Sequence, residues 1–329
     1  MKYQSPKPSF LGHKILDSID LKPILKYIDW TFFFYTWKIT GKYPGIETFC
    51  DQTDWLLQFP EKEREKAQEA LNLFQDAQAM LKEIISEKKM RAKAILYFSE
   101  ARSKNDGILF LPTKTQEEPL YIPMLRQQKP NEMSGFCYSL SDFLPILSNF
   151  SDMMSNFPPI QSDFIGIFAV TIQGAEEMSA QFQSQGDDYS ALLIKSLADR
   201  LAEATSEWLH EQVRKYYWGY APQESFTVEE LRKVPYQGIR PAVGYPSMPD
   251  QSVIFDLNKL LHLEKIGITL TENGVMLPSS SICGLYFSHP AAFYFMIDRI
   301  GEDQLRDYAE RKKCDPEKLK KWLAKIYLG

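Results

Sequence analysis

Residues 240–249, with the sequence RPAVGYPSMP, combine groups that suit a small charged ligand. Arg240 carries a planar, permanently charged guanidinium group, which can pair with a carboxylate through two parallel hydrogen bonds. The prolines keep the backbone extended, Gly244 lets the chain approach a ligand closely, and Tyr245 offers a flat ring to a cation or a purine. The segment predicts a site for a molecule with a carboxylate, a positive centre and a flat base. The alternative is a surface loop whose arginine makes an ordinary salt bridge.

Two further segments could contribute polar groups to such a site. Asp29 lies in an apolar and aromatic stretch at 21–43, where an unpaired buried carboxylate is costly and needs a partner or a ligand. The segment GLYFSHP at 284–290 reads as a strand edge that ends at a proline, and such an edge can present backbone groups to an adenine. It is equally compatible with a place in the core.

A long helix is expected from an N-cap at Asp187 or Asp188 to about residue 217. Its apolar positions predict a buried stripe made of Tyr189, Leu193, Leu197, Leu201, Ala204 and Trp208. A different, polar face carries Glu203, Glu207, His210 and Arg214. Spacing alone predicts that this polar face is a solvated surface.

The remaining pattern predicts helices around several strands. Apolar residues at three- and four-residue steps after Pro60 indicate an amphipathic helix. Strands are expected at 94–98, 108–111, 120–125 and 164–172, a hairpin around 272–274, and helices at 226–233, 302–312 and 316–328. Asp315 is expected to cap the last helix, with Pro316 at its first position. Helices at both ends of the chain around these strands favour an α+β class. We expect an N-terminal arm at 1–20 and a single α+β domain at 21–329.

The composition and the missing motifs argue against several classes of protein. A net charge of -5 argues against a general nucleic-acid binder, because phosphate neutralisation needs a cationic surface. There is no apolar N-terminal signal and no window near the ~18 apolar residues of a membrane span, and the four cysteines form no Cys-x-x-Cys pair, so the protein is expected to be cytoplasmic. No GxGxxG, Walker, HExxH or GxSxG motif occurs, and the four histidines lie too far apart to suggest a local metal cluster.

Five stretches, in order along the chain, resemble the C-terminal reactivation domain of cobalamin-dependent methionine synthase. They are YIDWTFFFYTWKITGKYP at 27–44, QGDDYSALLIKSLADRLAEATSEWLHEQVRKYYWGYAP at 185–222, YQGIRPAVGYPSMPD at 236–250, LTENGVMLPSSSICGLYFSHP at 270–290 and DYAERK at 307–312. Together they cover nearly the whole chain from about residue 21, which makes them far more specific than any single short motif. The resemblance implies the fold of that domain, a mainly antiparallel sheet flanked by long helices.

The resemblance also implies a ligand and the residues that hold it. In that family the domain binds S-adenosylmethionine, which remethylates cobalamin after its oxidation to cob(II)alamin. By position in the matching motifs, Arg240 is implied to hold the methionyl carboxylate and Asp29 a cationic or donor group of the ligand. Tyr286 and Phe287 are implied to line the adenosine pocket, largely through their backbone, and Glu203 matches a position near the ligand. The implied binding residues are completed by Ala242, Gly244 and Tyr245.

The resemblance implies partners as well. The family enzyme carries homocysteine, folate, cobalamin and reactivation modules on one polypeptide, and this chain resembles only the last. It lacks the DxHxxG motif that supplies the lower cobalt ligand, so we expect cobalamin on a partner methionine synthase core and flavodoxin or a similar flavoprotein as the electron donor. We expect a separately encoded subunit that acts in trans in methionine biosynthesis, with little or no activity alone, and an excised domain is the alternative.

Two other functions stay open. The chain could reactivate another corrinoid methyltransferase with the same ligand chemistry, or it could be a non-catalytic module that senses S-adenosylmethionine. The chain also departs from the resembled pattern near the arginine. Val243 replaces a common proline, which leaves the segment less rigid, and Val234 stands where related sequences often carry a glutamate. Whatever that glutamate contributes to ligand or domain contacts is absent here.

Overall fold

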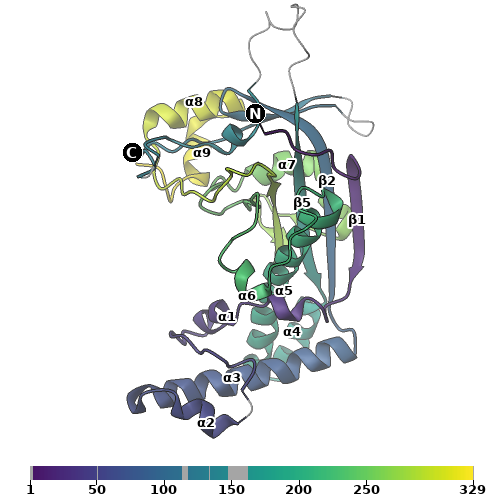
Figure 1. Cartoon of the computed structure of the whole chain (residues 1–329), viewed down its shortest axis with the longest axis vertical. Coiled ribbons are helices and arrows are strands. Elements are labelled where there is room, and N and C mark those ends of the chain that lie inside the picture. The colour runs from purple at the N-terminus through teal and green to yellow at the C-terminus, as the bar shows by residue number, and fades with distance from the viewer. Residues whose placement is uncertain (1–2, 50, 113–117, 133, 147–161, 329) are drawn as a thin grey trace, which may run out of the picture.

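The computed structural model describes residues 3–49, 51–112, 118–132, 134–146 and 162–328 (Figure 1). In this part of the chain six strands form one curled antiparallel sheet in the order β4-β3-β2-β5-β8, with β1 also paired to β2. The strands are β1 Gly12–Ile19, β2 Arg91–Lys104, β3 Gly107–Phe110, β4 Leu120–Pro123, β5 Asp163–Gln173 and β8 Ser281–Tyr286. Helices pack on the sheet, so the expected α+β class with a mainly antiparallel sheet is confirmed.

The long strand β2 holds the sheet together. β5 pairs with residues 91–101 of β2 along one edge, whereas β1 pairs with 92–98 and β3 with 101–104 along the other. β1 lies within the segment 1–20 that we expect to be an arm. Of that segment, residues 3–11 run without regular secondary structure, and residues 1–2 lie outside the described part of the chain.

Side chains of β2 alternate between two apolar cores, because successive residues of a strand point to opposite faces. Leu96 and Phe98 belong to one core, whose helical residues include those of α3 (Glu61–Ser86) and α5 (Asp188–Gln212). Ile95 and Tyr97 belong to the other, whose helical residues include those of α7 (Val253–Leu261) and α8 (Glu302–Lys312). Because both faces are buried in the middle of the strand, residues 94–98 of β2 form a continuous apolar run, whereas polar residues return toward both ends.

The helices mostly follow the predicted pattern. They are α1 Trp30–Thr36, α2 Gln52–Leu57, α3 Glu61–Ser86, α4 Ala175–Ser184, α5 Asp188–Gln212, α6 Val228–Leu231, α7 Val253–Leu261, α8 Glu302–Lys312 and α9 Pro316–Trp322. The side chain of Asp187 accepts from the backbone N–H of Ser190, and Asp315 caps α9 with Pro316 at its first position. Both caps confirm the prediction. The predicted hairpin is also present, as β6 Thr269–Leu270 and β7 Met276–Leu277.

Three local predictions need correction. α6 and α9 are shorter than the expected 226–233 and 316–328, because each ends in turns. The expected burial of Tyr189 is wrong, because its ring lies beside Trp37 near the surface, 5.3 Å between centroids, and its hydroxyl donates to Asp76 at 2.6 Å.

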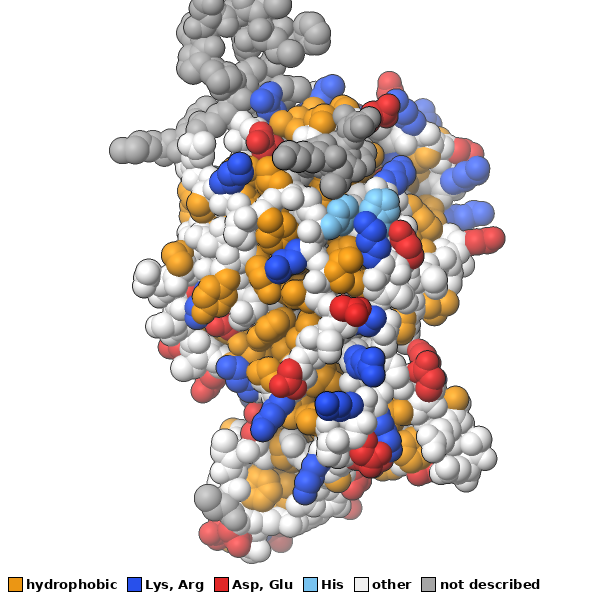
Figure 2. Space-filling model, turned by 90° about the vertical axis from the view of Figure 1, so that its right-hand side faces the viewer, with side chains coloured by type: hydrophobic (Ala, Val, Ile, Leu, Met, Phe, Trp, Pro, Cys, Tyr) orange, Lys and Arg blue, Asp and Glu red, His pale blue; other side chains and the backbone are white. Residues whose placement is uncertain are grey.

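No helix of the described residues is long and apolar enough to cross a membrane. Figure 2 shows the face on the β1 side, where the described cationic and anionic side chains are interspersed with apolar ones.

Residues 239–249 are hereafter called the arginine segment, and its first part runs along the outer edge of β8. Ile239 exchanges two backbone hydrogen bonds with Phe287, at 2.9 and 3.0 Å, and the N–H of Val243 donates to Cys283 at 2.9 Å. Residues 239–243 therefore extend the sheet as a short antiparallel run, and Arg240 projects from a backbone that is anchored on both sides.

Gly284 permits this close approach. A methyl group on its Cα would lie 2.4 Å from the carbonyl oxygen of Pro241 and 2.9 Å from the Cα of Ala242. We therefore expect Gly284→Ala to lower the free energy of unfolding by about 1–3 kcal/mol, the usual cost of an added methyl group at a packed site. Urea denaturation followed by circular dichroism measures this change.

Gly301→Ala is the matched control, because its added methyl group would meet a carboxylate oxygen of Asp303, which can rotate away. We expect this variant to lose no more than about 1 kcal/mol, because Gly301 is also the N-cap of α8, where alanine is less favourable than glycine. Equal stability of Gly284→Ala and wild type would contradict the role given to Gly284.

Candidate functional site

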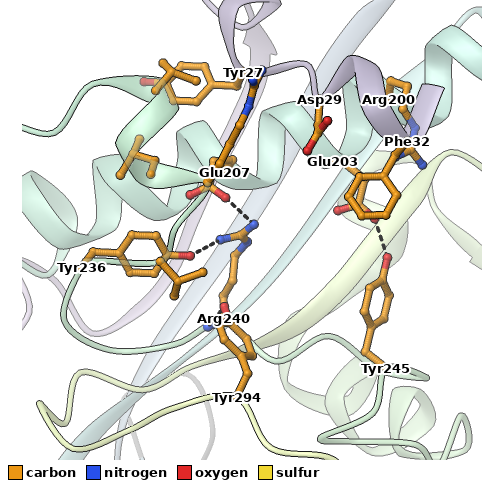
Figure 3. A pocket seen from close by; sticks show the side chains of 14 residues that line it. Tyr27, Asp29, Phe32, Arg200, Glu203, Glu207, Tyr236, Arg240, Tyr245 and Tyr294 are labelled. Carbon is orange, nitrogen blue, oxygen red and sulfur yellow. Dashed lines mark hydrogen bonds and ion pairs between the residues drawn. The ribbon is translucent and has the colours of Figure 1, made fainter. Parts of the chain in front are cut away.

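Two neighbouring cavities open beside the arginine segment. The first, of about 430 Å³, lies between the start of α1, the middle of α5 and residues 228–245 (Figure 3). The second, of about 410 Å³, lies over residues 240–247 and reaches residues 294–296. The two share four lining residues, which are Glu203, Arg240, Tyr245 and Tyr294. Together the two cavities form one groove, hereafter the arginine groove, which these side chains divide.

Arg240 points into this groove and is held by several neighbours (Figure 3). Its Nη2 donates to Oε2 of Glu207 at 2.6 Å, and its Nη1 donates to the hydroxyl of Tyr236 at 3.0 Å. Nη1 also lies 3.4 Å from Nδ1 of His210, and the backbone N–H of Arg240 donates to the hydroxyl of Tyr294 at 2.9 Å. Burial opposes the charge, but Glu207 raises the pKa of Arg240 well above its ordinary value. The guanidinium is therefore charged and fixed in orientation.

A second arginine lies behind Arg240. Arg214 is fully buried and makes two hydrogen bonds to Glu224, at 2.7 and 2.6 Å. Its guanidinium also lies 4.0 Å from the ring centroid of Tyr236. Since an unpaired buried charge is costly, each of these arginines has a carboxylate of its own. Tyr236 contacts both, one with its ring and the other with its hydroxyl.

The polar face of α5 is enclosed at its C-terminal end. Spacing predicts a solvated face there, and this prediction is wrong for His210 and Arg214, both of which are fully buried. The physical reason is that this end of the helix packs against β8, where the ring of His210 stacks on Tyr286 at 5.1 Å. Burial, and then the charges of Arg214 and Arg240, hold the pKa of His210 well below its ordinary value. The imidazole is therefore neutral.

Tyr245 stands where the two cavities meet, and its hydroxyl donates to Glu203 on α5 (Figure 3). Burial, and then the charge of Glu203, raise the pKa of Tyr245, so its hydroxyl stays protonated. Gly244 precedes it at a φ of +84° and lies outside the residues that line the groove. Its backbone forms the turn that brings the tyrosine ring to this position.

Asp29 lies on the opposite wall, at the N-terminus of α1 (Figure 3). Its Oδ1 accepts from the backbone N–H of Thr31 at 2.9 Å and so caps the helix. Its Oδ2 has no hydrogen-bond partner among the described residues. This wall therefore offers one carboxylate oxygen to a donor in the groove.

The second cavity has an open backbone edge. Ala242 lies opposite Gly284 in an antiparallel pair, and its N–H points away from β8. Within the described part of the chain this N–H has no hydrogen-bond partner. Since Pro241 has no N–H and that of Arg240 is held by Tyr294, Ala242 presents a free backbone donor to the cavity.

The side chains of Tyr286 and Phe287 lie beneath the arginine segment, outside the lining of the groove. Both are fully buried. Tyr286 stacks on Phe168 at 4.5 Å, and Phe287 packs at 6.1 Å from Phe143 on the other face of the sheet. The backbone of Phe287 is occupied by its pairing with Ile239. The two residues support the segment that carries the arginine.

Some residues that line the groove were predicted from the sequence, and others were not. Of the predicted residues, the fold brings together around the groove Asp29, Glu203, Arg240, Ala242 and Tyr245. The additional lining residues include Phe32, Arg200, Tyr236 and Tyr294. Tyr236 could have been found from its place four residues before Arg240, whereas Tyr294 follows no motif. Val234 lines the first cavity at a φ of +53°, a strained conformation for a β-branched residue.

Known proteins share the sequence pattern and the fold of this chain. A family model described as vitamin B12 dependent methionine synthase, activation domain, matches residues 20–313. Among solved structures, the chain is similar to the MetH reactivation domain bound to AdoHcy, with 36% sequence identity and a TM-score of 0.84. That similarity covers 99% of this chain and 93% of the other. The chain therefore belongs to the family of activation domains of vitamin B12-dependent methionine synthase.

Proposed function

We propose that the arginine groove binds S-adenosylmethionine, and that this chain presents the methyl group to a cobalamin carried by a partner methionine synthase core. The observation that carries the proposal is the charged fork of Arg240, fixed by Glu207 and Tyr236 in a groove with two halves. A similar domain is bound to AdoHcy, which is what S-adenosylmethionine becomes when its methyl group leaves. Both molecules share the amino acid, the sulfur and the adenosine.

The amino-acid end of the ligand has complementary groups in the first cavity. Arg240 would hold the carboxylate, because a guanidinium has five N–H donors and the protein contacts leave Nε–H without a partner among the described residues. Asp29 would accept from the ammonium group through its free Oδ2. The two charged ends of the amino acid would thus meet charges of opposite sign.

The sulfonium and the adenosine of the ligand would lie further along the groove, toward the second cavity. Glu203 and Tyr245 lie where the cavities meet, so a carboxylate and an aromatic ring would flank the positive sulfur. In the second cavity the N–H of Ala242 would donate to an adenine nitrogen. Tyr286 and Phe287 would contribute from beneath, by holding the arginine segment on β8.

The rim of the groove fits a partner that brings a flat surface to the methyl group. Five large apolar or aromatic side chains are exposed there: Phe32, Val234, Tyr245, Tyr294 and Met296. An apolar rim around a polar groove is typical of a surface that another molecule covers. The partner's cobalamin, once reduced by one electron from a flavodoxin or similar flavoprotein, would supply the nucleophile that takes the methyl group, and the sulfur would keep the electron pair of the broken bond. The role of this chain is to hold the methyl group in line, which needs no general acid or base.

Arg240→Ala should weaken binding of AdoHcy roughly 30- to 150-fold, because charge-assisted hydrogen bonds of roughly 2–3 kcal/mol are lost. Arg240→Lys keeps the charge but loses the fork, so an intermediate affinity is expected. Isothermal titration calorimetry measures both.

Arg306→Ala, on the exposed side of α8, is the control and should bind like wild type. Melting temperatures of all variants establish that they are folded. Wild-type affinity in folded Arg240→Ala would overturn the assignment.

The proposed action in trans has a direct assay. The chain is mixed with a cob(II)alamin-loaded methionine synthase core that lacks this domain, together with reductant and S-adenosylmethionine. We expect methylcobalamin absorbance to appear with the wild-type chain, and at a strongly reduced rate with Arg240→Ala at limiting ligand concentration.

The two alternative functions give different results in this assay. A reactivation subunit for another corrinoid methyltransferase would bind the ligand but methylate only that other protein. A sensing module would bind the ligand and methylate neither. Tight binding without methylation of the methionine synthase core would contradict the proposed partner while leaving the ligand site intact.

A further inference from the structure

The side chain of Glu207 forms a hydrogen-bonded ion pair with Arg240. Its Oε2 accepts from Nη2 of Arg240, and in the part of the chain described it makes no other hydrogen bond or ion pair. Its second oxygen, Oε1, is buried without a partner. A buried acceptor that is left unsatisfied costs stability. This cost indicates that Glu207 serves the arginine more than the packing of α5.

The other neighbours of Arg240 cannot take over this contact. Glu224 is already engaged by Arg214 through both of its oxygens. His210 is neutral and lies 3.4 Å from Nη1, and the remaining contact is the hydroxyl of Tyr236. Both of these groups act on Nη1, so among the described residues Glu207 is the one hydrogen-bond partner of Nη2.

An arginine that is fixed in advance binds its ligand more tightly. The side chain has several rotatable bonds, and ordering them during binding would cost free energy. The contact with Glu207 has ordered them before the ligand arrives. It also leaves N–H groups of Arg240 free for a carboxylate, since Nε–H has no partner among the described residues.

We propose that Glu207 is a positioning residue for Arg240, and that through it the groove selects nucleoside ligands that carry an amino-acid carboxylate. The inference rests on the proposed function, because it takes an S-adenosyl compound as the occupant. Glu207 acts by the position of its oxygen more than by its charge. The bound carboxylate brings its own negative charge to Arg240, so the position of the guanidinium is what Glu207 has to supply.

Two variants separate position from charge. Glu207→Gln keeps the length of the side chain and an oxygen that can accept from Nη2, but removes the charge. Glu207→Asp keeps the charge but is one methylene shorter, so its oxygens cannot reach Nη2 in the same place. Calorimetry compares two ligands: AdoHcy, and 5′-methylthioadenosine, which has the same nucleoside and a thioether but no amino-acid carboxylate.

We expect Glu207→Asp to weaken AdoHcy binding about tenfold or more, the effect of one lost hydrogen bond to a charged group, and to leave binding of 5′-methylthioadenosine within about twofold of wild type. Glu207→Gln should bind both ligands within about threefold of wild type. Glu310→Asp, an exposed position on α8, is the control for the substitution itself.

Several outcomes would overturn the proposal. They are unchanged AdoHcy binding in Glu207→Asp, an equal loss for both ligands, a loss in Glu207→Gln as large as in Glu207→Asp, or a Glu207→Asp chain that does not fold. Tighter AdoHcy binding in both variants would also overturn it, because Glu207 would then compete with the ligand carboxylate. If the wild-type chain binds neither ligand, the proposed function itself is wrong, and that result is distinct from all of these.

Discussion

Two guanidinium groups lie where α5, β8 and the arginine segment meet, one fully buried and one largely buried, and the free energy needed to remove them from water constrains the residues around them. Arg214 meets this requirement with Glu224, well inside the protein, where both oxygens of the carboxylate are used. Arg240 meets it with Glu207 at the wall of the groove, through a single contact. The inner arginine lies outside the residues that line the groove, whereas the outer arginine lines both cavities and keeps donors that face the groove. This difference separates a structural arginine from one that can still take a ligand.

The sheet brings these groups within reach of one another. β8 is paired on one edge with β5, and its other edge accepts the run of residues 239–243. Pro241 joins this run through its carbonyl oxygen alone, which accepts from the N–H of Leu285, because proline has no N–H to return. Gly284 lets the run approach closely, so that the side chain of Arg240 reaches α5. The position of one charged group thus depends on a backbone contact on the far side of its own segment.

The same arrangement gives the site its openness. α1, α5 and α6 contribute residues to the walls, and exposed apolar side chains surround the mouth of the groove. Such a groove can hold a long molecule by its charged end and its base while its middle stays accessible. This geometry suits a domain that delivers a group to a reaction centre on another molecule. In the proposed function the groove is therefore one half of an active site.

Some of this was determined by the sequence alone. Five stretches that match the family in the same order along the chain indicated the family, the α+β fold and the arginine motif. Such long matches include residues that pack the domain as well as residues that contact its ligand. Local rules correctly predicted the caps at Asp187 and Asp315, since a cap depends only on residues three positions apart or fewer. The tertiary structure decided which polar residues are buried. His210 and Arg214 have the spacing of a solvated face, and only the docking of α5 on β8 encloses them. Tyr294 reaches Arg240 across 54 residues of sequence, and no local pattern can encode such a contact, because it depends on how distant segments pack in space.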